Sequence, residues 1–262
     1  MRLLLSSICF VWVLSACNHE DSVTAEFKKC NKLSWKLLFD DDCTSAWQTN
    51  WLMDGTRSYI THSSKGMDYY AGKEAHNDTC HTVLWTKQKF SGDIKVEYDY
   101  TRLDTSHLGV NIIYLLANGS GKGDYDKDIF KWNELRKVPA MKEYYNHMNT
   151  YHISYAAYSF KENEPEYIRA RRYMPETGKG LKGTNLSPEY VNDSELFAPG
   201  IKHHIVIIKK GQKLYMHVTN SEKSRLFWFD TSNFPEIKEG RVGLRQMWTR
   251  AARYANFKIY GL

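Results

Sequence analysis

The sequence predicts an all-β protein folded as a sandwich of two sheets, and three observations lead to this prediction. Short runs rich in β-branched and aromatic residues recur along the chain, separated by glycine, asparagine or aspartate. Residues 93–100 alternate strictly between polar and apolar, which is typical of a strand with one face in water and the other on a core. Lys209-Lys210-Gly211-Gln212 has the composition of a hairpin turn between two strands.

The first residues have the layout of a bacterial lipoprotein signal. Arg2 supplies a positive charge, residues 3–13 form an apolar run, and Leu-Ser-Ala-Cys follows at residues 14–17. The apolar run is too short to cross a bilayer as a helix. We therefore predict that residues 1–16 are a signal peptide and that the mature protein begins at Cys17, with lipid on that cysteine. A plain secretory signal with a chance cysteine is the alternative.

The residues after the predicted lipidation site bear on location and on domain organisation. Asn18 stands where an aspartate would favour inner-membrane retention, so we expect an outer-membrane lipoprotein that touches the membrane only through its lipid anchor. Residues 17–33 are mostly polar and are predicted to be a lipidated tether. Residues 34–262 then form a single domain, long enough for one large β-sandwich.

The candidate strands of this domain follow one another at the short spacing of a sandwich. Their expected ranges, in chain order, are 35–39, 57–62, 67–71, 81–86, 93–101, 109–116, 151–159, 166–173, 202–209, 212–218, 224–229, 240–247 and 253–260. Two longer segments interrupt the series. Residues 118–148 begin with a glycine-rich turn and continue with many aromatic residues, and residues 174–200 carry three prolines and four glycines. Loops of this length inside a compact domain usually serve function.

Composition limits the classes of partner. The net charge of +6 is modest and no tract rich in lysine and arginine is present, which together with the export signal argues against nucleic acid. A mildly basic exported protein suits an acidic ligand, such as a uronate or a sulfated sugar. Aromatic residues make up 14% of the chain, a content that serves sugar stacking and a sandwich core equally well.

The mature chain keeps three cysteines besides Cys17, namely Cys30, Cys43 and Cys80. An oxidising compartment permits one disulfide, and Cys43–Cys80 is favoured because Cys30 lies near the predicted tether. No Cys-x-x-Cys pair is present, so we expect no zinc site and no cofactor. Residues 40–42 are three aspartates, which form a turn or hold a structural calcium ion.

Three blocks of the sequence carry a resemblance to a known family. They are residues 81–85, Asn149 with residues 152–155, and residues 243–247, while the segment 240–260 looks like the closing strand pair of concanavalin-A-like jelly rolls. On these residues the chain resembles the YesU-like family, whose members accompany the degradation of pectin and other acidic glycans. The resemblance covers most of the chain from about residue 34. It implies a concanavalin-A-like jelly-roll sandwich with long functional loops, acting on acidic oligosaccharides.

The family supplies no catalytic set to carry over, so the roles are argued from the chemistry of β-elimination at a uronate. A base removes the proton at C5, and an acid protonates the leaving group at C4, which is a sugar in a lyase and a hydroxyl in a dehydratase. Histidine and tyrosine suit these transfers, so we predict His152 and Tyr155 as catalytic residues. They are three apart, so a regular strand sends them to opposite faces. Both can serve only if a bulge intervenes or one lies at a strand end.

The C5 proton is acidic enough only when the neighbouring carboxylate is neutralised, for which arginine or an amide serves. Arg169, Arg171 and Tyr173 alternate and share one strand face. Arg245 lies opposite Leu244, which would point into the core, so Arg245 falls on the face where jelly-roll enzymes hold substrate. We predict that Arg245, with Arg169, neutralises the carboxylate. The predicted substrate-binding residues are Arg169, Arg171, Arg245, Asn149, His81, Trp85 and Gln246.

Two other functions remain open, as do structural roles for these histidines and arginines. A glycoside hydrolase needs two carboxylates that face each other across the sugar. Glu97 and Asp99 share a strand face, yet the third carboxylate expected of jelly-roll glucanases is missing. A non-catalytic glycan-binding lipoprotein would use tryptophans as a stacking platform, and the candidates are Trp47, Trp51, Trp85, Trp132, Trp228 and Trp248. Convergence of His152, Arg169 and Arg245 would favour an enzyme.

Overall fold

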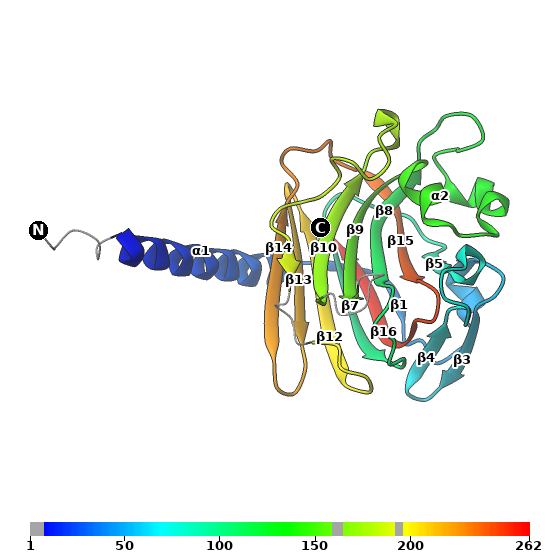
Figure 1. Ribbon diagram of the computed structural model, residues 1–262, viewed down its shortest axis with the longest axis horizontal. Coiled ribbons are helices and arrows are strands. Elements are labelled where there is room, and N and C mark those ends of the chain that lie inside the picture. Colours follow the sequence, from blue (N-terminus) through cyan, green and yellow to red (C-terminus); the bar gives the residue numbers. More distant parts are fainter. Residues whose placement is uncertain (1–7, 159–164, 192–195) are drawn as a thin grey trace, which may run out of the picture.

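Two antiparallel sheets of eight strands each pack face to face (Figure 1). The first sheet has the strand order β14-β13-β12-β7-β16-β4-β3, with β1 paired to β16, and the second has the order β11-β10-β9-β8-β15-β5-β2, with β6 paired to β15. The structure is a computed structural model that describes the backbone of residues 8–158, 165–191 and 196–262, and side chains from residue 20 onward. The predicted all-β sandwich is confirmed.

The first sheet contains β1 (Lys36–Asp41), β3 (Tyr59–Ser63), β4 (Gly66–Tyr70), β7 (Ile94–Arg102), β12 (Lys202–Lys210), β13 (Lys213–Thr219), β14 (Ser224–Asp230) and β16 (Ala251–Gly261). The second sheet contains β2 (Trp51–Asp54), β5 (Thr82–Thr86), β6 (Phe90–Ser91), β8 (Asn111–Gly119), β9 (Met148–Ala157), β10 (Tyr167–Tyr173), β11 (Tyr190–Val191) and β15 (Glu239–Gln246). The helical elements are α1 (Ile8–Asn31), η1 (Trp47–Thr49), η2 (Asp78–Cys80), η3 (Ile129–Arg136), α2 (Met141–Tyr145) and η4 (Pro175–Thr177).

Every predicted strand is present, with ends shifted by a few residues, although the last residue of the predicted strand 151–159 lies outside the described part of the chain. Three short strands, β2, β6 and β11, were not predicted. The hairpin prediction is confirmed, because Lys210 pairs with Lys213 and Gly211 takes the left-handed conformation at φ 53° that the turn requires.

The core between the sheets is built by alternation along the central strands. Tyr98 of β7, Ile153 of β9 and Leu244 of β15 all point inward and are fully buried. The next residue along each strand points to an outer face. A second apolar cluster therefore forms on the outer face of the second sheet, where residues of η3 and α2 cover it.

The segment predicted to be a tether is helical and partly packed. Helix α1 runs to Asn31, and Val23, Phe27 and Cys30 recur at helical spacing along one side of it. These side chains contact β12 and β13 on the outer face of the first sheet, and Figure 1 shows the rest of α1 extending away from the sandwich. The second half of α1 therefore packs on the first sheet, and the role of residues 17–33 as a lipidated tether stays a prediction. No helix in the described part of the chain is long and apolar enough to cross a membrane.

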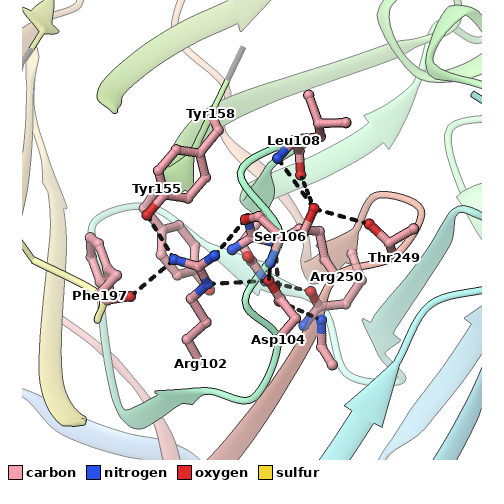
Figure 2. A network of polar contacts seen from close by, with 12 residues as sticks. Arg102, Asp104, Ser106, Leu108, Tyr155, Tyr158, Phe197, Thr249 and Arg250 are labelled. Carbon is pink, nitrogen blue, oxygen red and sulfur yellow. Dashed lines mark hydrogen bonds and ion pairs between the residues drawn. The ribbon is translucent and has the colours of Figure 1, made fainter. Parts of the chain in front are cut away.

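A buried polar network ties the loop after β7 to the start of β16 (Figure 2). The carboxylate of Asp104 lies 3.2 Å from Arg102 Nε and 3.2 Å from Arg250 Nε, and it accepts a hydrogen bond from the backbone N–H of Ala251. Arg102 also donates to the hydroxyl of Tyr158 at 2.7 Å. Because every member is buried or half-buried, the network anchors this loop against the sandwich.

The predicted disulfide is absent, because Cys30, Cys43 and Cys80 are all free and buried. Cys43 lies in the core between the sheets, Cys80 on the outer face of the second sheet, and Cys30 beneath α1. A sheet therefore separates Cys43 from Cys80, so the favoured pair cannot form.

Of the three aspartates at residues 40–42, the first two end β1 and the third follows it, and Asp41 and Asp42 have hydrogen-bond partners in the protein. Asp41 accepts hydrogen bonds from the backbone N–H of Cys43 and from Trp51 Nε1, and Asp42 accepts from Thr44. Among the described residues, no group of three His, Cys, Asp or Glu side chains is arranged to hold a metal ion. Asp41 and Asp42 therefore already accept hydrogen bonds from protein donors, and a structural calcium ion here stays an untested prediction.

Candidate functional site

The outer face of the second sheet carries a stack of aromatic rings beneath α2. Trp85 of β5 lies 5.3 Å from Tyr114 of β8 between ring centroids, and Tyr114 lies 5.9 Å from Tyr144 of α2 with nearly parallel planes. Gly243 on β15 makes room for this stack, because a Cβ there would lie 2.4 Å from the Trp85 ring. The stack holds α2 against the sheet.

His152 of β9 projects from the same outer face and is 3% exposed. Its Nδ1 lies 2.5 Å from the hydroxyl of Tyr173 on β10, and its Nε2 lies 2.6 Å from the hydroxyl of Ser154. A neutral imidazole has one donor and one acceptor nitrogen, so the ring donates one of these hydrogen bonds and accepts the other. Ser154 lies two residues after His152, so the alternation of a strand puts both side chains on one face.

The charge state of this pair follows from burial. Burial lowers the pKa of His152 well below its usual value, and the positive charges of three arginines add to the effect. In decreasing order of effect these are Arg171, Arg245 and Arg169. Burial raises the pKa of Tyr173 well above its usual value. The imidazole is therefore neutral and the phenol keeps its proton at neutral pH.

Arg245 of β15 is fully buried on this face beneath the covering segment. Its Nη2 donates to the carbonyl of Pro139 at 2.6 Å, and its guanidinium lies 4.6 Å from the centre of the Tyr144 ring. Its Nε and Nη1 have no hydrogen-bond partner. A buried guanidinium with two unused donors is costly to leave unpaired, so this position suits an anion.

Arg171 and Arg169 of β10 lie at the edge of the same face, where both are half-buried. Arg171 pairs with His152 across the strands and donates to the hydroxyl of Thr184 at 3.2 Å. Arg169 forms an ion pair with Glu189. The structure thus brings the three predicted arginines and His152 to one face. We call His152, Tyr173, Arg171 and Arg245 the outer-face cluster.

The carboxylate of Asp54 holds the covering elements, η3 and α2, against this cluster. The sequence did not predict this role. Its buried carboxylate accepts from Trp85 Nε1 at 2.7 Å, from Arg136 Nε at 2.6 Å, from the hydroxyl of Tyr144 at 3.0 Å and from Asn133 Nδ2 at 2.7 Å. Three of these donors belong to η3 and α2. Asp54 is the last residue of β2, which was not predicted as a strand, so no sequence pattern assigned Asp54 to this face.

Two predicted binding residues, His81 and Trp85, have structural partners on this face. The Nδ1 of His81 accepts the backbone N–H of Trp248 at 3.1 Å, and its Nε2 lies 3.1 Å from Asp78. Burial, with the charge of Arg245, lowers the pKa of His81 to about 2. Both side chains therefore shape the wall of the face rather than meet solvent.

Tyr155 and Gln246 point the other way, into the core between the sheets. The hydroxyl of Tyr155 lies 3.2 Å from that of Tyr254, which also accepts a hydrogen bond from Gln246 Nε2. The bulge of β9 against β10 consists of Tyr155 and Ala156, where φ of Ala156 is 42°, so no extra residue lies between His152 and Tyr155. The structure therefore does not bring Tyr155 or Gln246 to the cluster.

Asn149 also lies away from the cluster, at the end of the sandwich. Its Oδ1 accepts from Arg172 Nη1 at 3.2 Å. Both residues line a pocket of about 280 Å³ beside the loop that leads into β15. The side chain of Cys17, the predicted lipidation site, lies outside the described residues.

The residues of the two rival functions form no exposed site among the described residues, although Trp85, Trp132 and Trp248 belong to the apolar cluster of the outer face. Glu97 and Asp99 belong to the first sheet, where Glu97 pairs with Lys95 and Asp99 with His204. The tryptophans form no surface platform, since four are buried and two half-buried: Trp51, Trp85, Trp132 and Trp248, then Trp47 and Trp228.

The two sheets and their connections define a jelly-roll sandwich of the galectin and concanavalin-A kind. A Bacillus subtilis protein of unknown function with a galectin-like fold matches with a TM-score of 0.63 at 19% identity, over 86% of this chain and 97% of that one. Lectin II from Ulex europaeus matches with a TM-score of 0.54 at 10% identity, over 87% and 99% of the two chains. The predicted jelly roll is confirmed.

Residues 36–259 match the family described as a domain of unknown function (DUF1961), and the chain belongs to that family. The uncharacterized protein YesU of Bacillus subtilis (strain 168) is 24% identical over 186 residues, which are 70% of this chain and 78% of that protein. The resemblance to the YesU-like family is thereby confirmed.

Proposed function

We propose that the outer-face cluster acts on uronic-acid-containing oligosaccharides by β-elimination, as a lyase or a dehydratase that leaves a 4,5-unsaturated uronate. One observation carries the proposal. The hydrogen-bonded pair of His152 and Tyr173 lies beside two arginines, Arg171 and Arg245, that form no ion pair with any described carboxylate. Proton transfer groups next to unpaired cations are what elimination at a carboxylate-bearing sugar needs.

The pair supports the two proton transfers of the reaction. One member takes the C5 proton, the electrons of that C–H bond form the C4–C5 double bond, and the C4–O bond breaks. The leaving oxygen then takes a proton. Because His152 is neutral and Tyr173 is protonated, the resting pair holds one acceptor and one donor. Tyr173 thus takes the part that the sequence analysis gave to Tyr155.

The arginines support the activation of the C5 proton. Nε and Nη1 of Arg245 are unused donors on different edges of its guanidinium, so each can donate to a different acceptor oxygen, and Arg171 adds a second positive charge. Arg169 and Arg171 are the half-buried members at the edge of the face. His152 and Arg245 are buried beneath the cover, so the proposal requires the cover to move aside and substrate to enter past Arg169 and Arg171.

Two alternatives differ in what they require. A glycoside hydrolase needs a pair of free carboxylates, whereas Asp54 on this face already accepts four hydrogen bonds. A glycan-binding protein without catalysis needs no proton transfer pair. The lectin complexed with galactose, which matches with a TM-score of 0.54 at 9% identity, favours the binding alternative.

The experiment is to incubate the mature protein with a panel of acidic oligosaccharides. Ultraviolet absorbance follows the conjugated double bond, and mass spectrometry separates a lyase, which splits the chain, from a dehydratase, whose product is lighter by one water. We expect His152→Ala and Tyr173→Phe each to lower turnover by about 100-fold or more. Arg245→Ala should also lower it strongly on acidic substrates.

Tyr155→Phe is the matched control, since it removes one phenolic oxygen from the core without touching the cluster. It should keep full turnover. Full activity in both His152→Ala and Tyr173→Phe would refute the assignment. If the wild-type protein binds acidic oligosaccharides and never forms the unsaturated product, the binding alternative is correct.

We also propose that the protein acts at the outer membrane. The lipoprotein signal at residues 14–17, followed by Asn18, supports an anchor in the outer membrane, where exported oligosaccharides are met. The lipid is then the protein's only attachment to the membrane.

A further inference from the structure

A polar pocket lies at the end of the sandwich, away from the outer-face cluster. Its volume is about 280 Å³. Asn118 at the end of β8 and Asn149 at the start of β9 are paired across the strands and both line it. This pocket, which we call the end pocket, has no part in the proposed elimination.

Arg172 forms the floor of the end pocket and is only 3% exposed. Its Nε donates to the carbonyl of Pro235 at 3.1 Å, and its Nη1 donates to Asn149 Oδ1 at 3.2 Å. It forms no ion pair with any described carboxylate. Burial lowers the pKa of Arg172, which reflects the cost of holding this charge without a counter-ion.

The rim of the end pocket adds two more cations. Lys127 and Lys238 are exposed, line the pocket and form no ion pair with the described residues. Two carboxylates are also present. Glu236 lies 2.6 Å from Lys209, which neutralises it, while Glu239 has no cationic partner in the described chain.

This mixture of groups selects the chemistry of a ligand. Three cations, of which one is buried, attract an acidic group. The amides of Asn118 and Asn149 and the carboxylate of Glu239 accept hydrogen bonds from hydroxyls, and a carboxylate repels a bare anion. A polyhydroxylated acid satisfies both sets of groups, whereas an inorganic anion or a neutral sugar satisfies only one.

We propose that the end pocket is a separate binding site for an acidic sugar unit, with the carboxylate of a uronate on Arg172, Lys127 and Lys238. Asn149 lies three residues before His152, which is about 10 Å along a strand. The site therefore holds a sugar other than the one that reacts at the outer-face cluster. It does not depend on the proposed elimination, because the pocket's own groups define its ligand.

The test is calorimetric titration of the mature protein with D-galacturonate and D-glucuronate, with D-galactose and inorganic sulfate as comparison ligands. We expect uronate binding that the double variant Lys127→Ala/Lys238→Ala weakens by about tenfold or more. The matched control is Lys36→Ala/Lys73→Ala, which removes the same charge at two exposed lysines outside the pocket and should leave the affinity unchanged. Arg172→Gln should abolish binding, with thermal unfolding used to verify that the variant folds.

Each of four results would overturn the inference: no uronate binding, equal binding of sulfate, equal binding of galactose, or an unchanged affinity in the Lys127→Ala/Lys238→Ala protein. The last variant keeps the test valid even if Arg172→Gln does not fold. The outcome is independent of turnover, since a protein that never forms the unsaturated product can still bind a uronate here.

Discussion

Buried histidines are the residues at which this protein is most sensitive to acid. His81 accepts a backbone N–H at Nδ1, so the ring must stay neutral in the folded state. His152 is held neutral in the same way by burial. In the unfolded chain both titrate near pH 6.5, so below that pH the unfolded state binds protons that the folded state refuses.

The sign of the resulting pH dependence follows directly. Because the pKa of His81 is lowered on folding, its contribution to stability is present above about pH 6.5 and is lost as the pH falls. We expect His81→Asn, which keeps an acceptor but does not titrate, to flatten the fall in unfolding free energy between about pH 6 and pH 4 by about 1.4 kcal/mol per pH unit. Urea unfolding at several pH values measures this slope.

His204 provides a control of opposite sign. The hydrogen bond to Asp99 raises the pKa of His204, so its stabilising contribution is present below its unfolded pKa and is lost as the pH rises. His204→Asn should therefore make the fall in stability towards acid steeper. Parallel slopes for wild type and His81→Asn would contradict the buried neutral state of His81.

At the scale of elements, α1 shows how weak a helical signal can be in a polar segment. Only Val23, Phe27 and Cys30 mark its packed side, and the surrounding residues are polar. The polarity of this segment predicts a tether. The structure shows that a stripe of three apolar side chains is enough when β12 and β13 offer an apolar outer face.

The packing of α1 can be tested at Phe27. Its ring centroid lies 5.9 Å from that of Tyr215 and 5.0 Å from that of His217. We expect Phe27→Ala to lower the free energy of unfolding by about 3 kcal/mol in urea denaturation, because it empties a buried position. Lys28→Ala, at an exposed position on the same helix, should change it by no more than about 0.5 kcal/mol. Equal stability of the two variants would show that α1 does not pack.

At the scale of the whole molecule, the layers of the sandwich decide the state of the cysteines. Each of the three lies in a different apolar cluster. We expect a protein that begins at Asn18, and so lacks Cys9 and Cys17, to show three reactive thiols when unfolded, with or without prior reduction, and almost none when folded. An aromatic disulfide reagent counts them. A count of one reactive thiol in the unreduced, unfolded protein would instead show that two of the cysteines form a disulfide.

The proposed lipid anchor also belongs to the scale of the whole molecule, because it concerns where the protein is held. Replacing Cys17 with Ser should move the protein from the membrane fraction to the soluble fraction, since the remaining chain offers no spanning helix in its described part. Cell fractionation with immunoblotting measures this. Unchanged membrane association would contradict the lipid anchor.

The sequence by itself determined the all-β sandwich and nearly all of its strands, because alternation and turn residues are local signals. Within single strands it also aligned Arg169 with Arg171 and set Arg245 opposite Leu244, because side chains alternate along a strand, but only the strand pairing brought these residues and His152 to one face. Only the tertiary structure decided the partner of His152. Tyr155 is closer in sequence, but it points into the core, and Tyr173 reaches His152 because β10 pairs with β9. The role of Asp54 and the separation of the cysteines likewise depend on which layers meet, and strand pairing and packing between distant segments leave no mark in local spacing.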